Sequence, residues 1–252
     1  MDAGAFAITI DGDSAQVRTA AELVVALDVL QGNHDRAVLE QLRPHLSSII
    51  ADARGLHATL AVLAPEDKTF LIEAIGTDLR GVIGSGSRLR DILASLGETE
   101  VEEALLRTLG ADGLRTLIAS PTELAEVLEW VYDQCDELAL DLLGADWLQR
   151  MLRTGQEMAL VLRSLDRPRQ HKLIEMIGFE RVPALLMNEL DLAHMLRALP
   201  SELSCPLLEQ LPPERLRELV RDARDWAELE PFLEADERDY LLSVLEVTPD
   251  AE

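Results

Sequence analysis

Carboxylates at the spacing of a calcium-binding loop occur near the N-terminus. The segment DGDSAQVRTAAE places Asp11, Asp13 and Glu22 at loop positions one, three and twelve, where their oxygens could bind calcium. Position five needs an oxygen ligand and position six a glycine, but Ala15 and Gln16 stand there. An Asp-Gly turn in a hairpin therefore explains this segment better than a calcium site.

Glycines and histidines suggest two further kinds of chemistry. Gly81, Gly84 and Gly86 could line a phosphate loop, but no Lys-Ser/Thr pair follows and no strand precedes them, so a turn between helices fits better. The histidines form no i, i+4 pair and no base–nucleophile arrangement, and are interpreted as structural; they are His34, His45, His57, His171 and His194. The abundant carboxylates leave an acid/base pair open but mark no site. We therefore predict no catalytic residue, metal ligand or cofactor.

Composition favours an all-α protein with an acidic surface. Of 252 residues, 48% are apolar but only 4% are aromatic, which suits short helices packed by aliphatic side chains better than a β-sandwich. The formal net charge of −24 disfavours direct binding to nucleic acid or to anionic membranes. A partner with a basic surface fits this charge.

Cysteine usage and hydropathy predict a cytoplasmic chain. Cys135 and Cys205 lie far apart and show no metal-ligand spacing, so neither a disulfide framework nor a zinc site is expected. The N-terminus carries no secretion signal, and no stretch of eighteen apolar residues occurs, so membrane insertion is not expected.

One segment recurs along the chain at an almost constant spacing. Its copies start 33, 33, 35, 34, 34 and 34 residues apart. Apolar residues lie four, seven, eight and eleven positions after each start, which is one stripe of a helix. The starting residues are Thr19, Asp52, Ser85, Ser120, Thr154, Asn188 and Asp222.

Each starting residue, here called a cap residue, has an oxygen that can accept a hydrogen bond from an unpaired N–H at a helix start. In five copies an acidic residue follows three positions later. There it can reach back, as in a capping box, or face the positive helix end. These acids are Glu22, Glu123, Glu157, Asp191 and Asp225. The glutamates are expected to make the strongest capping interactions.

Two further apolar groups in each repeat predict two more short helices. The first of these helices should end at a glycine that adopts a left-handed cap, or at a proline; the residues are Gly76, Gly110, Gly144, Gly178 and Pro212. Such short helices need surface from their neighbours. We therefore expect about six three-helix repeats of 33–35 residues, stacked as an all-α, right-handed solenoid.

The ends of the chain differ from the repeat. AFAITI and AQVRT flank the turn DGDS, which predicts a small β-hairpin or extended cap within residues 1–18. The helical repeat domain is expected to span residues 19–246, and residues 247–252 a flexible tail.

The runs LLEQLPPERLRELV and LEADERDYLLSVL resemble the short-helix repeats of MgtE-type transporter N-terminal domains and of the FliG middle domain. HEAT-like and armadillo-like arrays are similar in their general architecture. The resemblance covers the general pattern across most of the chain and rests on leucines, acidic residues and the Pro-Pro break. It implies a superhelical architecture that contacts other proteins, and it carries over no functional residue.

Three aromatic residues depart from the repeat pattern. Trp147 occupies a position that is polar or small in the other repeats, and Phe179 and Trp130 also replace smaller residues. Exposed aromatic rings make good interface anchors. Trp147, Phe179 and Trp130 are therefore the candidate protein-binding residues, with gap-filling between repeats as the alternative.

These patterns lead to three hypotheses about function. The first is a non-enzymatic scaffold, adaptor or regulator that binds a protein partner, because helical arrays supply extended surfaces. The second is an acidic inhibitor or mimic that occupies a basic, nucleic-acid-binding surface of its target. The third is an enzyme with an active site between repeats that no motif reveals. The partner, the binding face and the oligomeric state stay open.

Overall fold

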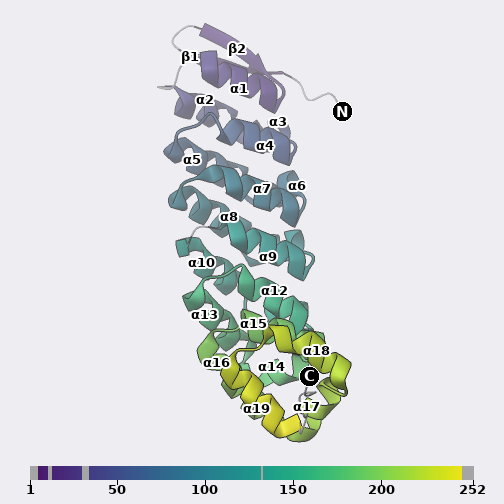
Figure 1. The fold of residues 1–252 in the computed structure, drawn as a ribbon. Coiled ribbons are helices and arrows are strands. Elements are labelled where there is room, and N and C mark those ends of the chain that lie inside the picture. The colour runs from purple at the N-terminus through teal and green to yellow at the C-terminus, as the bar shows by residue number, and fades with distance from the viewer. Residues whose placement is uncertain (1–4, 11–12, 30–33, 132, 246–252) are drawn as a thin grey trace. The chain divides into compact units, whose positions relative to one another are not determined.

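The computed structural model describes residues 5–10, 13–29, 34–131 and 133–245. This part of the chain is helical except for one antiparallel hairpin at its N-terminal end (Figure 1). Residue contacts divide the chain into two compact units, Met1–Ala119 with Trp130–Leu143, and Ser120–Glu129 with Gly144–Glu252. The predicted all-α class and the N-terminal hairpin are confirmed.

The first unit holds the hairpin and most of the N-terminal helices. Its elements are β1 (Phe6–Ile10), β2 (Asp13–Val17), α1 (Ala20–Val29), α2 (Asp35–Leu42), η1 (Arg43–His45), α3 (Leu46–Ile49), α4 (Ala53–Leu60), α5 (Pro65–Ile75), η2 (Gly76–Asp78), α6 (Leu79–Ile83), α7 (Gly86–Leu96), α8 (Thr99–Leu117) and α10 (Asp133–Leu143).

The second unit holds α9 up to Glu129 and the helices after α10. Its elements are α9 (Pro121–Trp130), α11 (Ala145–Met151), α12 (Gly155–Arg163), α13 (Arg167–Ile177), η3 (Phe179–Arg181), α14 (Val182–Leu185), α15 (Glu189–Ala198), α16 (Ser201–Gln210), α17 (Pro213–Leu219), α18 (Ala223–Leu229), η4 (Glu230–Phe232) and α19 (Ala235–Leu245).

Each of the predicted cap residues directly precedes a helix. The helices that they begin, here called the capped helices, are α1, α4, α7, α9, α12, α15 and α18. The side chain of Asp52, for example, accepts a hydrogen bond from the Gly55 N–H at 2.7 Å. Such a bond stabilises a helix by about 1 kcal/mol because it satisfies an otherwise unpaired donor. The predicted helix starts are therefore confirmed.

Four of the acidic residues that follow the caps reach back to the residue before the cap. Their carboxylates accept from its N–H in the pairs Glu22–Arg18 at 2.7 Å, Glu157–Arg153 at 2.7 Å, Asp191–Met187 at 2.9 Å and Asp225–Arg221 at 2.9 Å. The two aspartates make this contact while buried. Glu157 also accepts from the N–H of its own cap residue, Thr154, at 3.1 Å and so completes the predicted capping box there.

The capped helices pack against one another through their apolar stripes. In the first unit α1 packs on α4 and α4 on α7, while α8 packs on α5 and α10. In the second unit α12 packs on α15 and α15 on α18. Residues four, seven and eight positions after the caps form the core of these contacts and are buried, as Leu192, Met195 and Leu196 show, except for the half-buried Glu230 after the last cap.

The predicted glycine breaks are present, but their backbone differs from a left-handed cap. Gly76, Gly110, Gly144 and Gly178 have φ between 59° and 89°. Their ψ values lie outside the left-handed helical region, as at Gly110 with ψ −176°. That combination of angles is essentially restricted to glycine because a side chain would clash with the backbone. The chain therefore turns sharply at these glycines.

Long polar side chains bind the C-terminal carbonyls of helices that follow later in the chain. Arg115 donates to the carbonyl of Leu143 at 2.7 Å, and Gln149 to that of Ile177 at 3.1 Å. The last carbonyls of a helix have no partner within the helix. These bonds satisfy them, so one ties α8 to α10 in the first unit and the other ties α11 to α13 in the second.

The hairpin packs on the first two helices. Phe6 pairs with Val17 and Ile10 with Asp13, while β1 contacts α2 and β2 contacts α1. The Asp11–Gly12 turn lies outside the described residues. No helix in the described ranges combines the length and hydropathy needed to cross a membrane.

Candidate functional site

Exposed large apolar side chains gather on one side of the capped helices. In the described part of the chain they are Val25, Val29, Val62, Trp130, Met187 and Leu190. All except Met187 lie two, six or ten residues after a cap residue. Positions four apart share one face of a helix, and this face points away from the buried stripe. These exposed apolar residues therefore occupy the same face of the capped helices in each of the two units.

We call this surface the outer stripe. It comprises the residues two, six and ten positions after each cap, the last of which lies at or near the end of the helix. Its members are Ala21, Val25, Val29, Arg54, Ala58, Val62, Ser87, Asp91, Ser95, Thr122, Glu126, Trp130, Gln156, Leu160, Ser164, Leu190, His194, Ala198, Arg224, Glu228 and Phe232.

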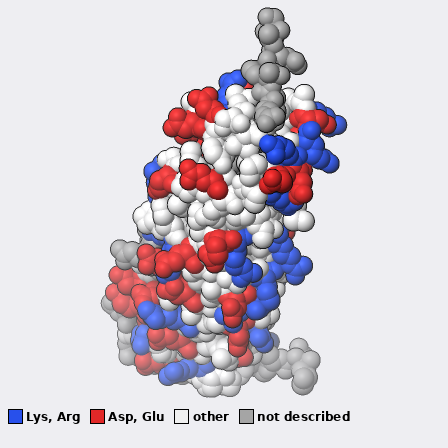
Figure 2. Space-filling model, turned by 90° about the horizontal axis from the view of Figure 1, so that it is seen from below, with Lys and Arg blue, Asp and Glu red and all other residues white. Residues whose placement is uncertain are grey.

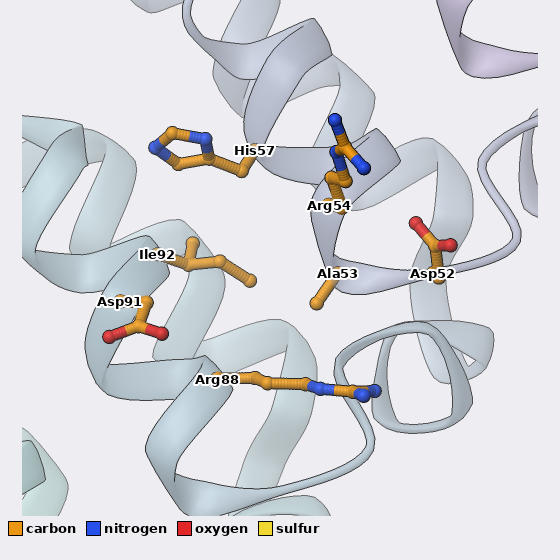
Figure 3. Close-up of a pocket in the computed structure, with 7 residues that line it drawn as sticks. All are labelled: Asp52, Ala53, Arg54, His57, Arg88, Asp91 and Ile92. Atoms are coloured by element: carbon orange, nitrogen blue, oxygen red, sulfur yellow. The ribbon is translucent and has the colours of Figure 1, made fainter.

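A first hollow of about 390 Å³ lies between α4 and α7. Figure 3 shows Arg54 and His57 projecting from α4 and Arg88 from α7, around the apolar side chains of Ala53 and Ile92. Asp52 and Asp91 add carboxylates to the rim, and Asp91 is paired with Arg90. An apolar floor with charged groups of both signs on the rim suits a side chain of another protein.

A second hollow of about 630 Å³ lies between β2 and α1. We call it the hairpin groove. Ser14, Ala15 and Gln16 line it from β2, and on the α1 side the outer-stripe residues Ala21, Val25 and Val29 are joined by Glu22 and Ala26. Val25 is 61% and Val29 69% exposed. These two side chains give the groove an open apolar wall.

A third hollow of about 350 Å³ lies in the second unit, between α9, α12 and α15. Thr122, Gln156, Leu160 and His194 line it, and all four belong to the outer stripe. Each of these three hollows thus includes outer-stripe residues. Among these three hollows, the hairpin groove is the one lined by large exposed apolar side chains of the stripe, Val25 and Val29.

Comparison with protein-family models, with curated proteins and with solved structures gave no significant match. The function of the chain is therefore inferred from its own geometry.

The three predicted aromatic residues do not share one environment. Trp130 is 49% exposed at the end of α9 and belongs to the outer stripe. Trp147 on α11 and Phe179 at the start of η3 are half-buried and lie outside the stripe. Trp130 is thus the candidate with the most ring surface open to a partner. The sequence-based candidates were aromatic residues that depart from the repeat pattern. The stripe follows the repeat spacing instead, so these candidates did not reveal it.

The segments considered for ion and phosphate binding have structural roles. Glu22 accepts hydrogen bonds at the start of α1, and Asp11 lies outside the described residues. Gly84 ends α6 in the left-handed conformation, directly before the Ser85 cap, as the turn interpretation predicts. In the described ranges, no group of three or more histidine, cysteine or acidic side chains could hold a metal ion.

Cys135 is buried at the start of α10, beside acidic residues of α8. Its Sγ donates to the Thr99 carbonyl at 3.6 Å. Burial raises the pKa of this thiol to about 11, and the nearby charges of Glu102, Glu103 and Asp136 add to the shift. Because the thiolate is the reactive form, this environment opposes a nucleophilic role.

We expect Cys135 to be almost inert toward a thiol reagent in the folded chain. In a Cys205→Ala variant, which leaves Cys135 as the remaining cysteine, labelling by Ellman's reagent at pH 8 should be at least about 100-fold slower than for a free cysteine, because so little thiolate is present. Unfolding in urea should restore fast labelling. Fast labelling of the folded variant would contradict the buried environment.

Proposed function

We propose that this chain is a non-enzymatic protein-binding module, and that its outer stripe contacts the partner. In this proposal the helices are repeats of a solenoid that presents the outer faces of its capped helices. The observation that carries it is that Val25, Val29, Val62, Trp130 and Leu190 all lie on the stripe, although it includes only a small part of the described residues. Exposed apolar side chains cost solubility, so their concentration on one surface marks a site that another molecule covers.

The partner that best fits the stripe is a protein with apolar anchors and cationic flanks. Val62 and Leu190 offer aliphatic contacts and Trp130 a large ring, and residues of this kind supply most of the binding energy of protein interfaces. The hollows lined by other residues of the stripe are large enough for single side chains. The net charge of −24 would attract a cationic partner and repel nucleic acid.

The charge alone also suggests an acidic mimic that occupies a nucleic-acid-binding surface. Such a mimic needs a continuous acidic field. On the face seen in Figure 2, however, Lys and Arg side chains are interspersed with Asp and Glu. We therefore place specificity in the apolar contacts and assign to the charge a role in long-range attraction.

A pair of matched double variants tests this proposal. Val62→Asp with Leu190→Asp adds two charges on the outer stripe. Met187→Asp with Thr77→Asp adds the same charge at exposed positions off the stripe. In capture experiments from lysate of the source cells, the stripe variant should retain at least about ten-fold less of the partner than wild type, because a charge placed in an apolar contact costs more than 1.4 kcal/mol.

The control variant should retain the partner like wild type. Equal loss in both variants would show that any added negative charge weakens binding, which contradicts an apolar docking surface. Washing with about 0.5 M salt separates the two hypotheses, since screening at that concentration removes most long-range attraction but leaves apolar contacts in place. Complete release by salt from the wild-type chain would favour the acidic mimic.

A further inference from the structure

The two outer edges of the hairpin differ in how their backbone groups are satisfied. On β1, the Gln41 side chain accepts from the Thr9 N–H at 3.1 Å and donates to the Thr9 carbonyl at 3.0 Å. The amide of Gln41 thus occupies the place of a neighbouring strand. Because an unpaired edge invites another chain, this contact closes the β1 edge to strand addition.

The β2 edge lacks such a closure. Paired residues in an antiparallel hairpin alternate between those that bond each other and those whose N–H and C=O point outward. The backbone N–H and C=O of Thr9 point outward to Gln41. The backbone N–H and C=O of its cross-strand partner Ser14 therefore point outward on the β2 side. Those of Gln16, two residues later, point the same way. Within the described residues, neither Ser14 nor Gln16 has a hydrogen-bond partner on that side.

The open edge borders the hairpin groove. Ser14 and Gln16 line one side of it, and Ala21, Val25 and Val29 line the other at four-residue intervals along α1. A strand added to β2 would enter this groove, and its alternate side chains would face α1. The groove thus combines a row of backbone donors and acceptors with an apolar wall, the two parts that strand-adding domains use for affinity and specificity.

We propose that the hairpin groove binds an extended segment of a protein partner as a third strand beside β2. The segment places alternate apolar side chains on Val25 and Val29, and its other side chains are cationic. A second copy of the chain is a poorer occupant because each copy carries a charge of −24, whereas a cationic segment is attracted by that charge and by Glu22 on the groove wall. This inference rests on the proposed function, since Ala21, Val25 and Val29 belong to the outer stripe.

A defined peptide probe tests strand addition. Fluorescein-labelled Ac-KVKVKVKV-NH2 is titrated with the full chain at about 0.15 M salt, and binding is followed by anisotropy. Ser14→Pro removes the outward N–H without touching the hairpin's own ladder, so it should weaken binding at least about ten-fold. Ala7→Pro makes the same change at an outward position of the opposite strand and should leave binding unchanged. Equal helical signals and melting temperatures of the two variants show that both fold.

Two further peptides separate strand pairing from charge attraction. KKVVKKVV has the same charge but lacks the alternation, and a form of the first peptide with alternate amides methylated cannot pair along its edge. Both should bind at least about ten-fold more weakly than the alternating peptide. Equal binding of all three peptides, or no binding of the first, would overturn the proposal.

Two other results bear on the occupant and on the proposed function. A dimer in sedimentation velocity that Ser14→Pro dissociates would make a second copy the occupant and overturn the partner segment. If strand addition fails while the Val62→Asp, Leu190→Asp variant still loses its captured partner, only the strand proposal falls. If that variant retains its partner as well, the outer stripe is not the docking surface.

Discussion

Replacing Asp191 with alanine is expected to lower the free energy of unfolding by about 3 kcal/mol, because two charge-assisted hydrogen bonds are lost together. The Asp191 side chain is only 2% exposed. One carboxylate oxygen accepts from the Gln156 N–H at 3.0 Å and the other from the Met187 N–H at 2.9 Å. Gln156 lies in the first turn of α12 and Met187 precedes α15. A single side chain therefore satisfies donors at the starts of two packed helices.

The matched control is Glu189→Ala. It removes the same charge from the first turn of the same helix, where no described side-chain bond is lost, and should cost only about 0.3–1 kcal/mol through the helix dipole. Urea unfolding followed by circular dichroism measures both variants. Hydrogen exchange should also quicken at Gln156 and Met187 in Asp191→Ala alone. Equal stability of the two variants would show that Asp191 does not join the helix starts.

Gly155→Ala is expected to destabilise the second unit by about 2–3 kcal/mol, the usual cost of forcing extra volume into a packed contact. A Cβ at this position would lie 2.8 Å from the Asp191 carbonyl oxygen and 3.0 Å from Leu186 Cδ2. The oxygen is part of the α15 backbone and cannot rotate away. The two helices would have to separate, which would also lengthen the bond between Gln156 and Asp191.

Gly81→Ala is the control for this substitution, and its effect on stability should have the opposite sign. Gly81 lies within α6 with an ordinary φ, and a Cβ there would meet no atom within 4 Å. Alanine should stabilise that helix by about 0.5–1 kcal/mol because it lowers the entropy of the unfolded chain. Thermal unfolding shows whether each variant has a higher or a lower melting temperature than wild type. A neutral or stabilising Gly155→Ala would mean that α12 and α15 do not approach so closely.

The features that could be predicted from the sequence depend on interactions between near neighbours. A cap such as Asp52 bonds the N–H three residues ahead, and Ile10 pairs with Asp13, three residues later in the chain. Buried positions such as Leu192 follow from helical periodicity. Because each of these interactions spans only a few residues, residue type and spacing are enough to identify it.

The candidate site depends on groups far apart in the chain. The bond between Asp191 and Gln156 spans 35 residues, and the one that closes the β1 edge joins Thr9 to Gln41 across 32. Periodicity shows which face of a helix is apolar, but a helix in an array contacts several neighbours. Whether Val25 or Trp130 stays open to solvent, or Trp147 becomes half-buried, therefore depends on which helices pack beside it, and that arrangement exists only once the distant segments have come together.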